Sequence, residues 1–279
     1  MGAQAFLRHL NAAERSYLQQ LTLTARQSVP DDWQGWRCGT VFLGRLPPGR
    51  AELLRQALPD CRFEGQELVW DAQEWSGPQR SAALQALLLE FRALGRVNGW
   101  RNERFSFWAN TDAAPDPQQP AWLSVERAGF RYLGMMSHAV HINGFTADGR
   151  VWCGRRAPDK ATDPGLWDNV TAGGLPSGES LLQCALRELQ EEAGLDAVSA
   201  DALCAAGGVR TSRPVAEGLH DETLWVYNLL LPHGLAPLNR DGEVCEFACL
   251  EPSRLIEMVR AGEFTADAVQ TLLRGLNFV

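Results

Sequence analysis

The first third of the chain alternates between helical and strand-type patterns of apolar residues. Apolar positions recur at helical spacing from about Ala3 to Leu21, and a second segment, about Arg80 to Ala93, is almost free of helix-breaking residues. Short strand-type runs lie between them, at Thr40–Leu43 and Leu68–Asp71, and a run rich in aromatic residues follows at Trp100–Trp108. The pattern predicts an α+β unit.

A proline-rich polar segment follows this unit. Thr111–Pro120 has no periodicity and the composition of a linker or exposed loop. A length of 279 residues is enough for one large or two modest domains. We therefore predict a smaller amino-terminal α+β domain over 1–120 and a second domain over 121–279.

The second part of the chain predicts a mixed sheet with helices. Ser137–Asn143 alternates apolar and polar residues, Ala147–Arg150 has the composition of a hairpin turn, and Val151–Gly154 is the returning strand. Further strands are expected at Leu203–Arg210, Leu224–Leu231 and Val244–Leu250, with closing helices near Pro252–Val259 and Ala266–Leu273.

Composition narrows the class of protein. Apolar residues make up 45% and charged residues 22% of the chain, as in an ordinary globular protein. No apolar run is long enough to cross a bilayer and the start lacks an export signal, so neither a membrane nor export is expected. A net charge of −8 disfavours a nucleic-acid partner.

The cysteines indicate the compartment. There are seven, an odd number without a CxxC pair, which predicts structural thiols in a reducing cytoplasm. Cys245 and Cys249 lie in a strand-type run, where their sulfurs would be roughly 13 Å apart, too far to share a metal.

One expected helix carries a cluster of carboxylates. A cap at Ser177 or Gly178 and a stop at Gly194 predict a helix of about sixteen residues. On it Glu188, Glu191 and Glu192 are spaced i, i+3 and i+4, so they project from one face. Such carboxylates repel one another unless a cation offsets their charge, and oxygen-bound divalent ions do so.

The alternative for these glutamates is a solvated acidic face without a ligand. Against it stands the loop that precedes the helix, where Gly173 and Gly174 follow a strand-type segment. Without side chains, their backbone can approach a metal ion or a phosphate closely. The loop and the helix together predict a site.

The spacing of this loop and helix resembles the Nudix box. The matching positions are Gly173, Glu179, the run Arg187-Glu188-Leu189, then Glu191-Glu192 and Gly194-Leu195. The resemblance implies a Nudix fold, an α/β/α sandwich around a mixed sheet. It also implies hydrolysis of a nucleoside diphosphate or another organic diphosphate with Mg²⁺ or Mn²⁺.

The resemblance also implies roles for individual residues. Glu188, Glu191 and Glu192 would bind the metal together with the Gly173 carbonyl, and Gly174 would line the phosphate. Arg187 would orient the glutamates, while Glu179 would hold the loop to the helix. Metal ions lower the pKa of a bound water and neutralise charge on phosphoryl oxygens, while a carboxylate accepts the proton of the water.

Basic and acidic segments on either side extend the predicted site. Arg156 and Lys160 resemble diphosphate-binding residues of Nudix branches that include the isopentenyl diphosphate isomerases; the alternative is solvated surface charge. Isomerase activity itself is the weaker hypothesis, because the corresponding loop of the isomerases does not normally have the Gly-Gly form. Downstream, Glu243 is the first candidate for a fourth carboxylate or general base and Glu246 the second.

Looser motifs outside the box resemble Nudix proteins related to the thiamine-pyrophosphokinase-linked kind, which carry an amino-terminal domain of this length. That resemblance implies thiamine diphosphate or an oxidised analogue as substrate, cut to its monophosphate. Trp100, Phe145 and Trp167 are candidate walls for its ring. ADP-ribose, nucleoside di- or triphosphates and a non-catalytic ligand-binding module remain alternatives. The oligomeric state stays open, with a homodimer among the options.

Overall fold

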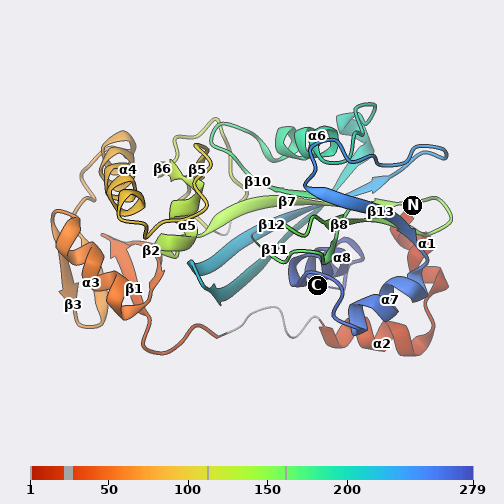
Figure 1. The fold of residues 1–279 in the computed structure, drawn as a ribbon, viewed down its shortest axis with the longest axis horizontal. Coiled ribbons are helices and arrows are strands. Elements are labelled where there is room, and N and C mark those ends of the chain that lie inside the picture. The colour runs from red at the N-terminus through yellow and green to blue at the C-terminus, as the bar shows by residue number, and fades with distance from the viewer. Residues whose placement is uncertain (1, 22–27, 112, 161, 279) are drawn as a thin grey trace.

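The computed structural model describes residues 2–21, 28–111, 113–160 and 162–278 (Figure 1). Its helices are α1 (Gly2–His9), α2 (Ala12–Leu21), α3 (Pro48–Ala57), α4 (Gly77–Ala93), α5 (Arg127–Leu133), α6 (Leu181–Glu191), α7 (Pro252–Arg260) and α8 (Ala266–Gly275), with a short 3-10 turn at Ala200–Ala202. Its strands are β1 (Gln34–Cys38), β2 (Val41–Leu46), β3 (Cys61–Glu64), β4 (Glu67–Trp70), β5 (Arg104–Phe107), β6 (Leu123–Glu126), β7 (Ser137–Phe145), β8 (Val151–Arg156), β9 (Trp167–Asp168), β10 (Thr171–Gly174), β11 (Leu203–Val215), β12 (Gly218–Leu230) and β13 (Val244–Leu250).

The carboxy-terminal part is built on a seven-stranded mixed sheet. Its main order is β11-β12-β7-β8-β13, with β10 beside β7 and β9 beside β8. The β12–β7 pair is parallel and the other pairs are antiparallel. Helix α6 covers one face, and α7 and α8 cover the other together with α1 and α2 (Figure 1). The predicted sandwich of helices around a mixed sheet is confirmed.

The amino-terminal part has a smaller sheet of its own, in the order β2-β1-β4-β3. It is α+β, as predicted, although the strands β1 and β3 and the helix α3 were not expected from the sequence. Trp36 and Trp70 are fully buried between the sheet and its helices. The Trp36 indole donates to the carbonyl of Leu133, 2.8 Å away, so α5 is tied to this core.

The domain boundary predicted at residue 120 stays a prediction. Hydrophobic side chains pack across this position in both directions. Side chains of β6 and α5, including Val125 and Phe130, belong to the amino-terminal core. Phe6 and Leu18 of the two first helices instead pack in the carboxy-terminal core, with Phe145 and the α7–α8 pair. Each core therefore contains elements from both sides of residue 120. Residue 112 of the predicted linker lies outside the described residues.

The single helix predicted from Ala3 to Leu21 is wrong, since α1 ends at His9 and α2 begins at Ala12. Asn11 accepts a hydrogen bond from the Glu14 amide at 2.9 Å, and its own amide donates to the Glu14 carboxylate at 2.8 Å. This reciprocal cap starts a new helix despite continuous apolar periodicity. None of the described helices is long and apolar enough to cross a membrane, and the seven cysteines are free.

The position of α1 leads to a stability prediction. Phe6 is fully buried and meets Phe145 edge-on, with ring centroids 6.2 Å apart. Phe6→Ala should lower the free energy of unfolding of the whole chain by about 3–5 kcal/mol, because it leaves a cavity in the carboxy-terminal core. Gln4→Ala, at an exposed position of the same helix, should stay within about 0.5 kcal/mol of the parent. Equal denaturation midpoints for the two variants would show that α1 does not belong to this core.

Candidate active site

Helix α6 begins later and is shorter than predicted. Its cap is Ser180, whose hydroxyl accepts from the Gln183 amide at 3.2 Å while the Gln183 side chain accepts from the Ser180 amide at 2.9 Å. The predicted caps Ser177 and Gly178 lie in the preceding turn, and the helix has 11 residues rather than sixteen. Gly194, with φ +62, follows its end as predicted.

The apolar face of α6 sets its rotation. Cys184, Ala185 and Leu189 are completely buried against Val140 and Ile142 of β7. Because this stripe faces the sheet, the adjoining positions 188 and 192 also turn inward, toward β10. The packing of the helix thus places two glutamates at the edge of the core.

Glu188 and Glu192 lie against the backbone of β10. A Cβ atom on Gly173 would overlap the Glu188 carboxylate, so only glycine fits there. The Ala172 amide donates to Glu192 at 3.2 Å, and both glutamates are less than 10% exposed. Glu191 at the last position of the helix has a side chain that is 52% exposed. The three predicted ligands therefore do not share one environment.

Arg187 connects the acidic groups. Its Nε donates to Glu179 at 3.0 Å, and its Nη1 donates to Glu188 at 2.8 Å and to Glu191 at 3.0 Å. The roles predicted for Arg187 and Glu179 match this geometry, since the pair joins the loop to the helix. One cation among several carboxylates leaves the cluster with excess negative charge.

A second acidic segment faces Glu192 from the start of β13. Oxygen atoms of Glu192, Asp241 and Glu243 all lie within 4.8 Å of one another. Asp241 was not among the predicted site residues, and only its position two residues before Glu243 could have suggested it. Glu246 is exposed and pairs with Arg155 at 3.6 Å, away from this cluster. Glu243 is thus the late carboxylate that the fold places at the site.

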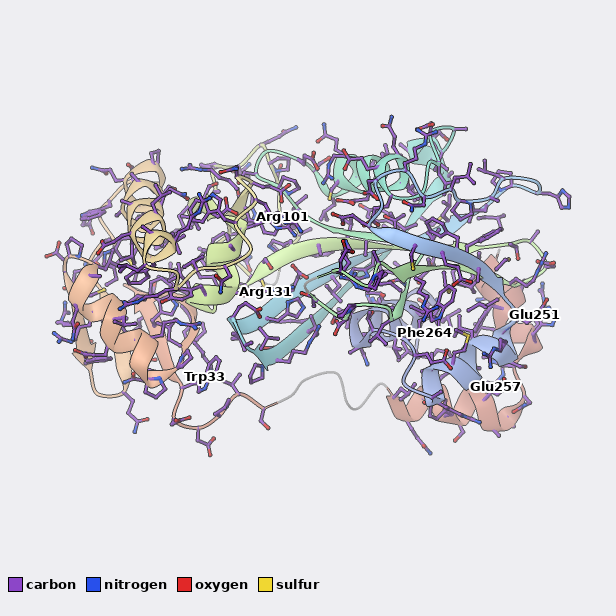
Figure 2. All side chains as sticks on the ribbon, viewed as in Figure 1. Trp33, Arg101, Arg131, Glu251, Glu257 and Phe264 are labelled. Carbon is purple, nitrogen blue, oxygen red and sulfur yellow. The ribbon has the colours of Figure 1, made fainter. Side chains whose placement is uncertain are left out.

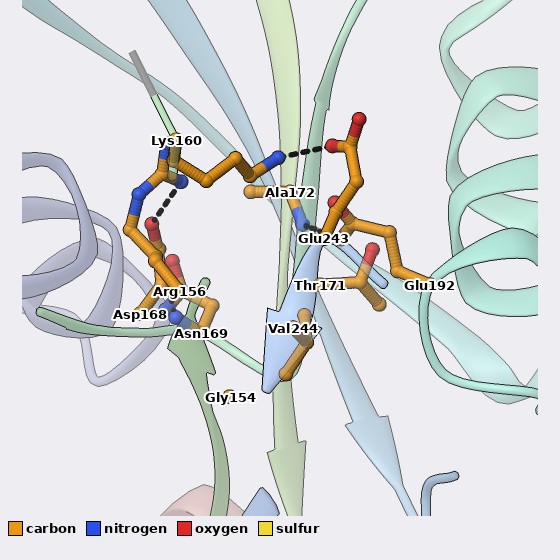
Figure 3. Close-up of a pocket in the computed structure, with 10 residues that line it drawn as sticks. All are labelled: Gly154, Arg156, Lys160, Asp168, Asn169, Thr171, Ala172, Glu192, Glu243 and Val244. Atoms are coloured by element: carbon orange, nitrogen blue, oxygen red, sulfur yellow. Dashed lines mark hydrogen bonds and ion pairs between the residues drawn. The ribbon is translucent and has the colours of Figure 1, made fainter. Parts of the chain in front are cut away.

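Glu192 and Glu243 border a cleft (Figure 3). Its lining consists of Gly154, Arg156, Lys160, Asp168, Asn169, Thr171, Ala172, Glu192, Glu243 and Val244. Lys160 forms an ion pair with Glu243 across the cleft, and Arg156 pairs with Asp168 at 3.2 Å. Arg156 also donates to the Thr162 carbonyl at 2.9 Å, so both predicted diphosphate-binding residues line the cleft and both have partners there.

Two positions of β10 behave differently from each other. The Thr171 hydroxyl is buried in the cleft wall and has no hydrogen-bond partner among the described residues, and nothing in the sequence pattern singled it out. Gly174, predicted to bind phosphate, lies outside the cleft lining and packs under the Phe105 ring. Its lack of a side chain therefore serves the contact with β5.

Burial and mutual repulsion dominate the electrostatics of the carboxylates. Burial raises the pKa of Glu192 to about 8, and the charge of Glu188 adds to the rise. Burial likewise raises the pKa of Glu188, against the opposing effect of Arg187. Glu243 differs: burial favours its protonated form, but the hydrogen bond and charge of Lys160 outweigh burial and lower its pKa.

The donor set fits a divalent metal ion. Glu192, Asp241 and Glu243 would hold it, since their oxygen atoms converge, and Glu188 beside Gly173 is a further candidate ligand; Glu191 is exposed and stays a predicted ligand. Carboxylate and carbonyl oxygens are the donors preferred by Mg²⁺ and Mn²⁺. A cation at this point would stabilise the ionised form of the two glutamates, whose pKa burial raises.

Residues 137–271 match the NUDIX domain. The chain is also 33% identical over 153 residues to an isopentenyl-diphosphate Delta-isomerase of Streptomyces griseus, covering 51% of this chain and 74% of that protein. The chain belongs to the Nudix family. The matched segment contains α6, its glycine loop and Glu243, but leaves the amino-terminal sheet outside.

Plant members of the Nudix family match a longer stretch. Nudix hydrolase 24, chloroplastic, of Arabidopsis thaliana is 32% identical over 198 residues, covering 70% of this chain and 53% of that protein. Nudix hydrolase 20, chloroplastic, of the same plant is 33% identical over 173 residues, covering 61% and 45%. The chain spans about half the length of these relatives.

The buried carboxylates predict opposite effects of one substitution. Glu192→Gln should raise the thermal midpoint of the metal-free protein near neutral pH, because burial disfavours the ionised form and folding there makes the Glu192 carboxyl take up a proton. The same variant should show a smaller rise in midpoint on adding Mn²⁺, because a ligand is lost. Scanning calorimetry with and without Mn²⁺ measures both effects.

The matched control is Glu90→Gln, at an exposed position of α4. It should leave both midpoints unchanged, since an exposed carboxylate is already solvated. A full Mn²⁺ response in Glu192→Gln would remove Glu192 from the metal site.

Proposed function

We propose that this protein hydrolyses the diphosphate linkage of a small organic diphosphate, with Mg²⁺ or Mn²⁺ as cofactor. The observation that carries the proposal is the convergence of Glu192, buried against β10 beside Glu188, with Asp241 and Glu243, whose oxygen atoms lie within 4.8 Å of one another and of Glu192. Burying like charges together is unfavourable unless a cation joins them. The Nudix family and the cationic Lys160 at the same cleft support a phosphate-bearing ligand.

The residues of the chain suggest how the reaction proceeds. A divalent ion held by Glu192 with Asp241 and Glu243 would supply charge neutralisation on the phosphoryl oxygens and would make water a better nucleophile. Water attacks one phosphorus, the bond to the bridging oxygen breaks, and two phosphate products leave. Lys160 pairs with Glu243 in the free protein. If it moves to the phosphate, the pKa of Glu243 rises and its carboxylate becomes a better acceptor for the proton of the water.

Thiamine diphosphate or an oxidised analogue, cut to its monophosphate, is the substrate we propose within this class. The resemblance of the motifs outside the Nudix box supports it, and a net charge of −8 suits a ligand with a cationic ring. The aromatic walls predicted for the ring need correction. Phe145 is buried against α1, Trp167 is buried in the same core, and neither lines the cleft. ADP-ribose and nucleoside di- or triphosphates remain the competing substrates.

Hydrolysis should depend on the glutamates of α6. Glu191→Gln and Glu192→Gln should each lower kcat about 100-fold or more, equivalent to roughly 2.7 kcal/mol of transition-state stabilisation. Phosphate release from a diphosphate panel at saturating Mg²⁺ measures the effect, with Glu90→Gln as a variant of unchanged rate. Near-normal turnover in both site variants would contradict the proposed role. Metal-dependent binding without turnover in the parent protein would instead identify a ligand-binding module.

The substrate is tested by comparing kcat/KM at one Mg²⁺ concentration. We expect thiamine diphosphate or an oxidised analogue to exceed ADP-ribose and the common nucleoside triphosphates. A preference of about a hundredfold or more for any nucleotide would overturn the thiamine proposal. The hydrolase proposal would stand in that case, because the glutamates contact phosphates rather than the organic group.

A further inference from the structure

The strand pair β5–β6 of the amino-terminal part lies directly against the loop that precedes α6. Phe105 and Pro176 form an isolated bridge, and the Ser177 amide donates to the Arg104 carbonyl at 2.8 Å. The Ser177 hydroxyl is 3.0 Å from that of Ser106 and 2.7 Å from that of Ser124. These contacts place the amino-terminal part at one side of the catalytic loop.

Two arginines lie next to this strand pair, one before β5 and one after β6. The Arg101 amide donates to the buried carboxylate of Glu126 at 2.9 Å, which fixes its backbone. Arg127 follows β6; its amide donates to the Glu103 carbonyl at 2.9 Å, and its guanidinium lies 5.1 Å from the centre of the Phe105 ring. Both side chains are exposed on backbone that is held firmly.

The backbone that carries both arginines packs next to the cleft. The Phe105 ring beside the Arg127 guanidinium packs against Gly174 of β10, two residues after Ala172 in the cleft lining. A third arginine of the same region, Arg131, donates to the Thr162 hydroxyl at 2.9 Å, next to the segment that carries Lys160. Figure 2 shows Arg101 and Arg131 where the amino-terminal part meets the large sheet.

The pairing of the two arginines differs. Arg127 forms an ion pair with Glu103 at 2.7 Å. Across the described ranges, the Arg101 guanidinium has neither a hydrogen-bond nor an ion-pair partner. A cation that is carried on firmly held backbone near the cleft and lacks a local partner is suited to an anionic ligand.

We propose that Arg101 and Arg127 bind a phosphate of the substrate beside Lys160, so that the amino-terminal part completes the Nudix site. The proposal rests on the proposed function for the identity of the ligand as a diphosphate. It extends the site beyond residues 137–271, because both arginines precede the matched domain.

The cluster of cations favours one class of diphosphate. A free terminal phosphate carries a charge of about −1.5 to −2 near neutral pH, whereas each phosphate of a diester such as ADP-ribose carries a single charge. Three cations, Lys160, Arg101 and Arg127, stabilise a free terminal phosphate more than a phosphate of a diester, because the free phosphate carries more charge. The site therefore favours a diphosphate esterified at one end only.

The test measures binding without turnover. Methylenediphosphonate, a diphosphate analogue that resists hydrolysis, is titrated calorimetrically into the full chain with Mg²⁺. Arg101→Ala and Arg127→Ala should each weaken binding about fivefold to tenfold, and Arg101→Lys should retain most of the affinity. Glu103→Gln should tighten binding about twofold to threefold, because it frees Arg127 and removes a negative charge; a purely structural role of the Glu103–Arg127 pair predicts no gain.

Arg55→Ala is the matched control, since Arg55 is exposed on α3 and paired with Glu52 at 2.6 Å. Its affinity should stay within about twofold of the parent, and thermal midpoints confirm that every variant is folded. Affinities of Arg101→Ala and Arg127→Ala equal to that of Arg55→Ala, or no binding by the parent, would overturn the proposal. Arginine-dependent binding without hydrolysis of any diphosphate would refute the proposed function but leave this binding site standing.

A second measurement tests the class of substrate. Arg101→Ala should lower kcat/KM for ADP, which has a free terminal phosphate, about fivefold more than for ADP-ribose, which has none. An equal loss for both would overturn the preference for a free end.

Discussion

The burial of Glu188 and Glu192 against the backbone of β10 is the constraint on which the rest of the site depends. It requires glycine at position 173, because a side chain there would occupy the space of the Glu188 carboxylate. It also requires the apolar stripe of α6, since Ala185 and Leu189 hold the helix in the rotation that turns both glutamates inward. The protein thus uses the packing energy of a helix to hold two like charges together.

Two basic residues, Arg187 and Lys160, lie on opposite sides of these buried glutamates. Arg187 contacts Glu179, Glu188 and Glu191 on the helix side, and Lys160 contacts Glu243 on the far side of the cleft. Neither cation compensates the pair completely, and the pKa values of Glu188 and Glu192 stay raised. Burial that disfavours ionised carboxylates in this way favours the binding of a metal ion, and we expect the paired Lys160 to exchange Glu243 for a phosphate.

Several contacts join the amino-terminal part to the Nudix domain, and two of them involve the cores and the site. Helix α1 inserts Phe6 into the core below the large sheet, and β5 lies on the loop before α6 with Phe105 over Gly174. A mutation in this part can therefore change the site either by loosening the loop or by moving the arginines near Glu243. The two routes differ in their signature, since the first alters stability and the second alters anion affinity.

The sequence by itself determined the chemistry of the site and the class of fold. Spacing along a helix is a local property, so the i, i+3, i+4 glutamates, the Gly-Gly turn and the alternating strands could be read from the chain directly. Tertiary structure decided which carboxylate is buried, because Glu191 differs from Glu192 only in how α6 rotates against β7. It also decided that Asp241 and Glu243 face Glu192, that Gly174 serves β5, and that Arg101 lies where the amino-terminal part meets the large sheet. These are contacts between residues far apart in the chain, and they depend on how the elements pack, which no local pattern encodes.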